Sequence, residues 1–249
     1  MKALITGASS GIGRDMAKIL SEMGYDIYAV ARRSEKLETL KNELKTNVYP
    51  LVYDLSDRNQ CFKLFEELKD EDIEIVINNA GFGICGKFCD TEISRELEMI
   101  NTNITAVHIL TKLFCQKFKT LNKGRILNVA SSAGYMMGPL LSAYYASKAY
   151  VLRLSQAIRR ELIEDKSAVT ISILCPGPVK TEFDKVANVG FSLKGLESMY
   201  VAKCGIEGMF KGKEVIKPGI SIKLLLFFAR FIPDALLSKI TYHIQHKKL

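Results

Sequence analysis

Tyr144 and Lys148 stand four residues apart, and their types and spacing could do chemistry. Because four residues span about one helical turn, the two side chains would share one face of a helix. A free phenol has a pKa of about 10 and transfers protons poorly near neutrality. A neighbouring ammonium stabilises the phenolate, so the pair predicts a tyrosine whose pKa is lowered for acid–base catalysis. Taken alone, such a pair is in most proteins ordinary helix surface.

A serine supports the catalytic interpretation. Ser131 lies 13 residues before Tyr144 and directly follows the apolar stretch 125–130. If that stretch is a parallel strand, Ser131 stands at its carboxyl end, where enzymes with parallel sheets keep their active sites. Ser132 and Tyr145 adjoin the two chosen residues. The four-residue step to Lys148 favours Tyr144, and the 13-residue spacing to Tyr144 favours Ser131.

A glycine-rich segment follows the first apolar stretch of the chain. Its sequence is Thr6-Gly7-Ala8-Ser9-Ser10-Gly11-Ile12-Gly13, and a helical pattern begins within it. The glycines permit a tight turn and let the backbone approach a pyrophosphate, which the amides of the following helix then bind. A simple turn is the alternative, but the strand–turn–helix context favours a dinucleotide site.

Two arginines, Arg32 and Arg33, follow the second apolar stretch. NAD-binding proteins usually place a carboxylate here to hold the ribose hydroxyls, whereas a guanidinium suits a 2′-phosphate. A solvated basic helix start is the alternative, although arginine there opposes the helix dipole. The position favours NADP(H) over NAD(H).

The elements that must position these residues alternate regularly along the chain. Apolar stretches rich in Ile, Val and Leu, each expected to be a strand, occupy residues 2–6, 26–31, 48–53, 73–78, 125–130 and 169–175, with a last strand near 213–217. Segments with apolar residues at three- and four-residue spacing separate them. This alternation predicts an α/β fold, a Rossmann-like doubly wound parallel sheet of about seven strands with helices on both faces. No linker divides the chain, so 1–249 is predicted to be a single domain, with 188–249 as an appended substrate or oligomer lobe.

Composition excludes several classes of protein. The 249 residues are 48% hydrophobic and 25% charged, which is typical of globular proteins and not of disordered, collagen-like or coiled-coil chains. The formal charge of +8 could serve an anionic partner, but the lysines are spread along helices, so no nucleic acid is expected.

No cysteine or histidine spacing resembles a metal site. The six cysteines are predicted to be reduced, and with no apolar stretch of signal-peptide length we expect a cytoplasmic protein. The uncharged stretch 126–147 is too polar to span a membrane.

These motifs together resemble the short-chain dehydrogenase/reductase family, in the branch with a TGxxxGxG turn and a YxxxK pair. The resemblance covers about residues 1–185, and the C-terminus loosely resembles DltE-like and steroid-dehydrogenase-like members. It adds four matching segments: Asp54-Leu55-Ser56, Asn78-Asn79-Ala80-Gly81, Asn101-Thr102-Asn103-Ile104 and Pro176-Gly177-Pro178-Val179-Lys180-Thr181.

The resemblance implies a role for each catalytic residue. Tyr144 would be the general acid/base, Ser131 would bind the substrate oxygen, and Lys148 would hold the nicotinamide ribose and tune Tyr144. Asn103, with Asn101 as a weaker rival, would steady a water that links Lys148 to solvent. The cofactor-binding residues would be Gly7, Ser9, Ser10, Gly11, Ile12, Gly13, Arg32, Arg33, Asp54, Leu55, Asn79, Ala80, Gly81, Tyr144, Lys148, Pro176, Gly177, Val179 and Thr181. The family also implies a homodimer or homotetramer, with helices 103–119 and 142–165 as the usual contact surfaces.

The expected function is therefore an NADP(H)-dependent oxidoreductase that interconverts a carbonyl and a primary or secondary alcohol. The alternative is a dinucleotide-binding redox sensor without turnover, which would have no use for an intact Ser131–Tyr144–Lys148 set.

Loops after the fourth, fifth and sixth strands should supply the substrate site. They offer Phe82, Ile84, Cys85, Tyr135, Met136, Met137, Leu141, Phe183 and Val186, although several of these could simply pack the core. This mostly apolar set predicts an apolar carbonyl or alcohol as substrate; Lys180 or Lys185 could instead pair with an acidic one. The C-terminal Leu224, Phe227, Phe228 and Phe231 could form a core helix, an oligomer contact or a lid, and their basic neighbours also allow a membrane-surface role.

Overall fold

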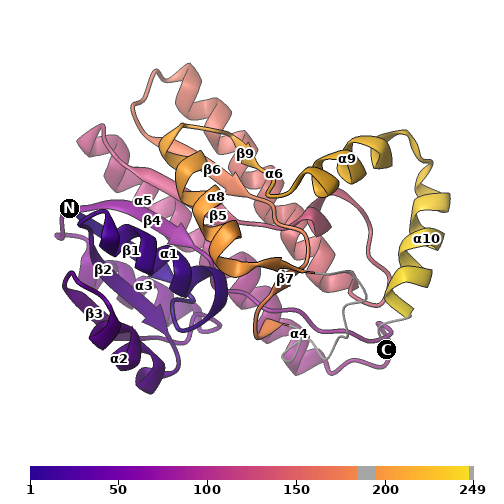
Figure 1. The fold of residues 1–249 in the computed structure, drawn as a ribbon, viewed down its shortest axis with the longest axis horizontal. Coiled ribbons are helices and arrows are strands. Elements are labelled where there is room, and N and C mark those ends of the chain that lie inside the picture. The colour runs from indigo at the N-terminus through magenta and orange to yellow at the C-terminus, as the bar shows by residue number, and fades with distance from the viewer. Residues whose placement is uncertain (184–194, 247–249) are drawn as a thin grey trace.

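A seven-stranded parallel sheet forms the centre of the protein, whose computed structural model describes residues 1–183 and 195–246 (Figure 1). The strands of this sheet are β1 (Lys2–Thr6), β2 (Asp26–Ala31), β3 (Val48–Val52), β4 (Ile73–Asn78), β5 (Arg125–Val129), β6 (Thr170–Leu174) and β9 (Val215–Ile216). Their spatial order is β3-β2-β1-β4-β5-β6-β9, and every neighbouring pair is parallel. The predicted Rossmann-like fold is confirmed.

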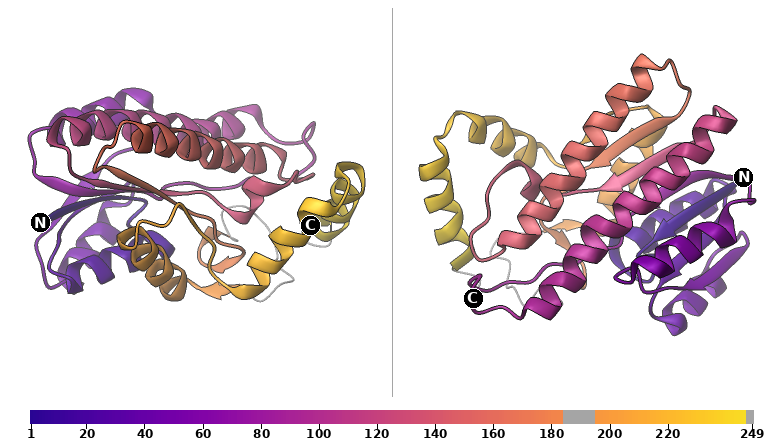
Figure 2. Two further views of the ribbon diagram at one scale, coloured as in Figure 1. Left: turned by 90° about the horizontal axis from the view of Figure 1, so that it is seen from above. Right: turned by 180° about the vertical axis from the view of Figure 1, so that it is seen from behind.

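Helices cover both faces of this sheet, as Figure 2 shows in its left view. The helices that pack on the sheet are α1 (Gly11–Glu22), α2 (Ser34–Glu43) and α8 (Ser198–Phe210) on one face, and α3 (Arg58–Leu68), α5 (Val107–Leu121) and α6 (Ser142–Glu164) on the other. Two further helices, α9 (Ile220–Phe228) and α10 (Asp234–His246), follow β9. α8 belongs to the core and β9 extends the sheet, so among the helices of residues 1–183 and 195–246 it is α9 and α10 that project from the body (Figure 1).

The strands supply alternate residues to two cores. In β1, Ala3 and Ile5 belong to the core under α1 and α8, whereas Leu4 belongs to the core under α3 and α5. All three are fully buried. Successive side chains of a strand point to opposite faces, so a strand covered by helices on both faces must be apolar throughout. This requirement is the reason that the strands could be located from the sequence.

The direction of winding reverses between β1 and β4, and the site residues gather at this point. β2 and β3 lie on one side of β1, while β4, β5 and β6 follow on the other. Two backbone amides just after β4, those of Asn79 and Ala80, donate hydrogen bonds to Thr6 Oγ1 at 3.0 and 3.1 Å. Such a switch point opens a crevice at the carboxyl ends of the strands, where ligands of these folds bind.

Three local features depart from the sequence expectations. A two-stranded parallel sheet, β7 (Val179–Lys180) with β8 (Leu196–Glu197), was not predicted, and β9 is shorter than the expected 213–217. α4 (Ile93–Ile100) continues directly into α5 through a π-helical stretch at Asn101–Ala106. A short 3-10 turn (Ser132–Tyr135) follows β5. Among the described residues, no helix combines the length and the apolar character needed to cross a membrane.

Candidate active site

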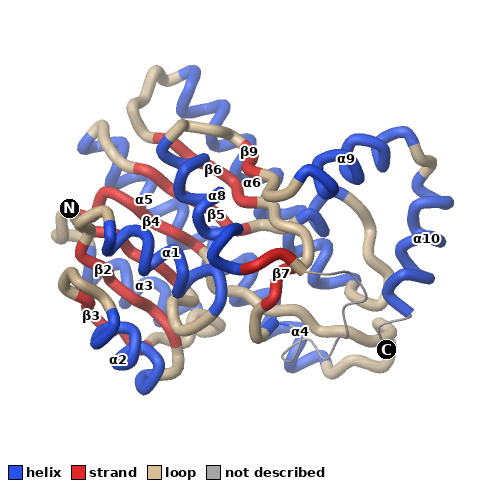
Figure 3. The backbone as a smooth tube through the Cα atoms, viewed as in Figure 1, coloured by secondary structure: helices blue, strands red, loops and turns tan. Residues whose placement is uncertain are grey.

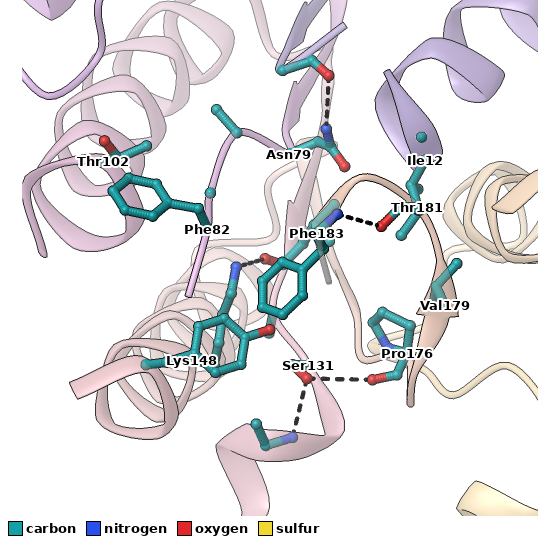
Figure 4. Close-up of a pocket in the computed structure, with 18 of the residues that line it drawn as sticks. Ile12, Asn79, Phe82, Thr102, Ser131, Lys148, Pro176, Val179, Thr181 and Phe183 are labelled. Carbon is teal, nitrogen blue, oxygen red and sulfur yellow. Dashed lines mark hydrogen bonds between the residues drawn. The ribbon is translucent and has the colours of Figure 1, made fainter. Parts of the chain in front are cut away.

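One cavity of about 510 Å³ lies at the carboxyl edge of the sheet, a size ordinary for small-molecule sites. It is lined by 18 of the predicted cofactor-site residues, two of which (Tyr144 and Lys148) are also predicted catalytic residues, and by Ser131. The 18 are Gly7, Ser9, Ser10, Gly11, Ile12, Arg32, Arg33, Asp54, Leu55, Asn79, Ala80, Gly81, Tyr144, Lys148, Pro176, Gly177, Val179 and Thr181. Gly13 and Asn103 lie behind the lining. Residues from widely separated segments of the chain thus meet in one hollow, part of which Figure 4 shows.

The glycine turn is shaped for close approach of backbone. Gly7 has a φ of +66°, and a Cβ atom there would lie 2.9 Å from the Ala80 Cα. Gly13 has no such φ, but a Cβ atom would lie 2.5 Å from the Gly7 carbonyl oxygen and 2.4 Å from Asn79 Nδ2. Ser10 begins α1 without a side-chain cap, which leaves the first-turn amides and the positive end of the helix dipole to an anion in the cavity. The turn therefore fits a pyrophosphate.

Arg33 and Arg32 have different surroundings. Arg33 Nη2 donates to Ser9 Oγ at 3.0 Å and to Ser10 Oγ at 3.2 Å, directly beside the glycine turn. Arg32 Nη1 instead bonds Glu98 Oε1 at 2.8 Å and lies 3.9 Å from Asp54 Oδ2. Both arginines line the cavity. Arg33, however, is the one held next to the serines of the turn.

A carboxylate missed by the sequence analysis, Glu182, occupies the same region. It lies 2.5 Å from Lys36 Nζ and 2.9 Å from Arg33 Nη2, and these two cations lower the pKa of Glu182 to about 2. Glu182 is thus an anion at neutral pH, held where two cations meet at the edge of the cavity. A second anion bound to Arg33 would have to share those cations or displace the carboxylate.

Ser131 and Tyr144 face each other in the cavity. Ser131 Oγ accepts from the Ala133 amide at 3.1 Å and donates to the Pro176 carbonyl at 3.4 Å, the two bonds drawn beside it in Figure 4. Burial raises the pKa of Tyr144 to about 12, and the hydrogen bond to Ser131 opposes that rise. The lowering expected from the sequence is therefore wrong for the protein alone, because loss of water around the phenolate outweighs its polar neighbours. The phenol is fully protonated at neutral pH.

Lys148 is buried one turn further along α6. Its Nζ donates to the Val129 carbonyl at 3.0 Å and lies 5.9 Å from the centre of the Tyr144 ring. The side chain is 5% exposed, and this burial lowers the pKa of Lys148 to about 8. The lysine can therefore change charge within the range in which enzymes work.

Asn103 supports the cavity from behind. Its Nδ2 donates to the Phe82 carbonyl at 2.9 Å and to Ser147 Oγ at 3.1 Å, while its Oδ1 accepts from the Phe82 amide at 3.1 Å. A Cβ atom on Gly81 would lie 2.9 Å from Asn103 Oδ1 and 3.3 Å from Lys148 Nζ, so glycine leaves room between the amide and the ammonium. Asn101 Oδ1 instead accepts from Thr105 within its own helix.

The substrate lining differs in part from the expectation. Phe82, Met136, Leu141 and Phe183 line the cavity. Among the other residues that were expected there, Ile84, Cys85, Tyr135 and Met137 do not, and Lys185 and Val186 lie outside the described residues. Tyr135 packs against the core under α6, and Lys180 is engaged by Glu197 at 2.5 Å.

Residues from α9 and α10 close the remaining side of the cavity; a C-terminal substrate lobe or lid was among the expectations, but these particular residues were not predicted. Ile222, Leu225, Thr241, Ile244 and Gln245 are all part of the lining. Gln245 is buried; its Nε2 donates to Tyr145 OH at 2.6 Å, and its Oε1 accepts no hydrogen bond in the described structure. Its partner Tyr145 is the rival of Tyr144, and it too lines the cavity.

A doubly wound sheet with a cavity at its switch point is the architecture of many nucleotide-binding proteins. Residues 1–189 match the model of the family described as short chain dehydrogenase. The chain belongs to this family, and with it to the dehydrogenases and reductases.

Individual relatives agree with this assignment. The chain is 32% identical over 235 residues to the NADP-dependent 3-hydroxy acid dehydrogenase of Schizosaccharomyces pombe, which covers 90% of this chain and 85% of that protein. Among solved structures, a short-chain dehydrogenase from Sphingobium yanoikuyae in complex with NADPH matches with a TM-score of 0.83 and 29% identity, over 92% of this chain and 93% of that one. The bulky-bulky ketone specific alcohol dehydrogenase from Comamonas testosteroni matches with a TM-score of 0.77 and 27% identity, over 92% of both chains.

Proposed function

We propose that this protein is an NADP(H)-dependent oxidoreductase that interconverts an apolar ketone or aldehyde and the corresponding alcohol. The observation that carries the proposal is the meeting of Ser131, Tyr144 and Lys148 in the same cavity as the glycine turn. Two similar proteins support the choice of cofactor: the relative from Schizosaccharomyces pombe is an NADP-dependent dehydrogenase, and the similar structure from Sphingobium yanoikuyae is a complex with NADPH.

The proposed mechanism assigns proton handling to the protein. NADP(H), when bound, supplies or accepts the hydride. In carbonyl reduction, the Ser131 hydroxyl binds the substrate oxygen, and Tyr144 donates its phenolic proton to that oxygen. The raised pKa of Tyr144 keeps this proton in place throughout the neutral range. Lys148 then stabilises the phenolate that remains, and Asn103 holds the Phe82 backbone beside it.

The cavity lining supports an apolar substrate. Phe82, Met136, Leu141 and Phe183 offer mainly apolar contact, and methionine adapts to varied shapes. Turnover of a panel of ketones tests the proposal by following NADPH absorbance.

Replacing Arg33 by glutamine should weaken NADPH binding by about 10- to 100-fold, the loss expected for hydrogen bonds to a charged group. NADH lacks the 2′-phosphate, so its dissociation constant should change by less than about threefold. Fluorescence titration of both nucleotides measures the two effects. The matched variant is Arg32→Gln, since Arg32 is held by Glu98 and lies away from the serines of the turn. A larger NADPH effect in Arg32→Gln would contradict the assignment.

Replacing Glu182 by glutamine should tighten NADPH binding by about two- to five-fold, because a partly exposed carboxylate competes for Arg33 and Lys36. NADH binding should not change. Glu197→Gln is the control, since Glu197 pairs with Lys180. Weaker NADPH binding in Glu182→Gln would show instead that the carboxylate orients Arg33 for the nucleotide.

A further inference from the structure

The segment 217–246, here called the C-terminal arm, leaves many large apolar side chains uncovered. It comprises α9, a 3-10 turn at Ala229–Phe231 and α10, which together project from the body (Figures 1 and 2). Ile220 is 75% exposed, Phe231 72% and Phe228 60%. Further exposed residues of the arm are Leu224, Leu225, Phe227, Leu236, Ile240, Tyr242 and Ile244. Exposed apolar side chains concentrated on one segment are typical of an interaction site.

Four of the exposed residues of α9 and of the turn that follows it form one stripe. Ile220, Leu224, Phe227 and Phe231 follow the three- and four-residue spacing of a helix stripe. The 3-10 turn after α9 carries Phe231 beside Phe227, with ring centres 5.5 Å apart. The opposite side of α9 is held by the body, because Leu226 is buried and Ile222 packs against Gly177. The arm is thus anchored on one side and apolar on the other.

Cations border this apolar face. Lys217, Lys223 and Arg230 line one hollow of about 330 Å³ together with Phe227. None of the three forms an ion pair with a residue of the described ranges 1–183 and 195–246. Residues 217–246 contain four lysines and arginines and a single acidic residue, Asp234. The hollow therefore has the charge and the donors to hold an anion, such as a phosphate group.

We propose that the C-terminal arm docks the protein on an anionic lipid surface. In this arrangement Leu224, Phe228 and Phe231 enter the boundary of the acyl chains, while Lys217, Lys223 and Arg230 bind lipid phosphates. Apolar side chains flanked by lysine and arginine on a helix lying in the interface are the general pattern of such contacts. A second copy of the chain fits less well, because a symmetric contact would bring the same cations together without the carboxylates needed to balance them.

The docked arm also forms a wall of the candidate active site. Ile222, Leu225 and Ile244 line the cavity, and Leu225 and Ile244 belong to the exposed set as well. An apolar substrate dissolved in the lipid would therefore meet the cavity at its apolar side. This consequence rests on the proposed function, whereas the docking itself does not.

Vesicle flotation of the full chain tests the docking independently of activity. We expect the protein to float with vesicles of phosphatidylcholine mixed with phosphatidylglycerol, and to bind pure phosphatidylcholine far less. Lys223→Gln/Arg230→Gln should weaken binding to the anionic vesicles by about 30-fold, since each cation near such a surface contributes about a factor of five. Phe228→Ser/Phe231→Ser should weaken it by at least as much.

Two control variants match these changes elsewhere on the surface. Lys63→Gln/Lys112→Gln removes the same charge from exposed positions of α3 and α5, and Leu121→Ser/Ile163→Ser removes exposed apolar side chains at the ends of α5 and α6. Circular dichroism verifies that each variant is folded. The proposal is overturned if the wild-type protein fails to float, or if the control variants lose binding as much as the arm variants do. It is also overturned if Phe228→Ser/Phe231→Ser dissociates an oligomer in sedimentation while neither the oligomer nor the dissociated protein binds vesicles.

Discussion

Replacing Tyr144 by phenylalanine lowers kcat for carbonyl reduction by about 10²- to 10⁴-fold, the usual contribution of a positioned general acid. The substitution removes only the hydroxyl, so the ring should still pack against Phe183, with ring centres 5.2 Å apart. NADPH binding should stay within about threefold of the wild type, because the glycine turn and Arg33 are untouched. Steady-state turnover of an apolar ketone and fluorescence titration of NADPH together check both parts.

The neighbouring tyrosine provides the matched control. Tyr145 lies next to Tyr144, with ring centres 6.1 Å apart, and its hydroxyl is engaged by Gln245. Tyr145→Phe should keep kcat within about tenfold of the wild type, since it removes an ordinary hydrogen bond. If Tyr145→Phe abolishes turnover and Tyr144→Phe does not, the proton donor has been assigned to the wrong residue. If neither variant affects turnover, the protein's activity does not use this cavity as proposed.

Replacing Lys148 by methionine should abolish most turnover and yet stabilise the protein without nucleotide by roughly 2 kcal/mol at pH 7. Burial lowers the pKa of Lys148 from 10.5 to about 8, a difference that corresponds to about 3 kcal/mol against the buried ammonium. Loss of the hydrogen bond to Val129 takes back about 1 kcal/mol. Urea unfolding measures the free energy, and turnover is measured on the same samples.

The pH dependence distinguishes this explanation from better packing by methionine. A lysine whose pKa is lower in the folded state releases its proton first in that state, so wild-type stability should rise between about pH 8 and 10.5. The advantage of Lys148→Met should therefore shrink over the same range. Lys112→Met, at an exposed position of α5, should change stability by less than about 0.5 kcal/mol at every pH. An advantage for Lys148→Met that stays constant with pH would contradict the charge argument.

Features encoded by local pattern could be predicted from the sequence. The strands were visible because both faces of the sheet are covered, so that the middle of β1 needs apolar residues at the consecutive positions Ala3, Leu4 and Ile5. The glycine turn was visible because Gly7 and Gly13 stand where a Cβ atom would collide with neighbouring backbone. That Ser131, Tyr144 and Lys148 share one cavity could be expected, because Ser131 follows the carboxyl end of β5 and the other two residues are linked to it by their spacing.

Features that depend on distant segments could not be predicted. Glu182 meets Lys36 only after folding, 146 residues away in the chain, and neither residue stands in a motif. Gln245 reaches Tyr145 from a helix that carries no signature. The direction of the Tyr144 pKa shift was also beyond the sequence, because spacing reports the neighbouring lysine but not the burial of the phenol. The roles of the site residues and the division of the chain into a body and an appended lobe stay predictions.

The π-helical stretch at Asn101–Ala106 bears on how this part of the chain can change in length. A π turn takes up one more residue than an α turn, so the helices before and after it keep the faces they present. Leu110, Phe114 and Phe118 of α5 are buried against the sheet, and Asn103 hydrogen-bonds the Phe82 backbone. Ala106, the last residue of the stretch, is itself part of the core that contains these three residues. The stretch therefore ties the position of Asn103 in the site to the packing of α5, so that an insertion or deletion of a single residue here would have to leave both Asn103 and Ala106 in place.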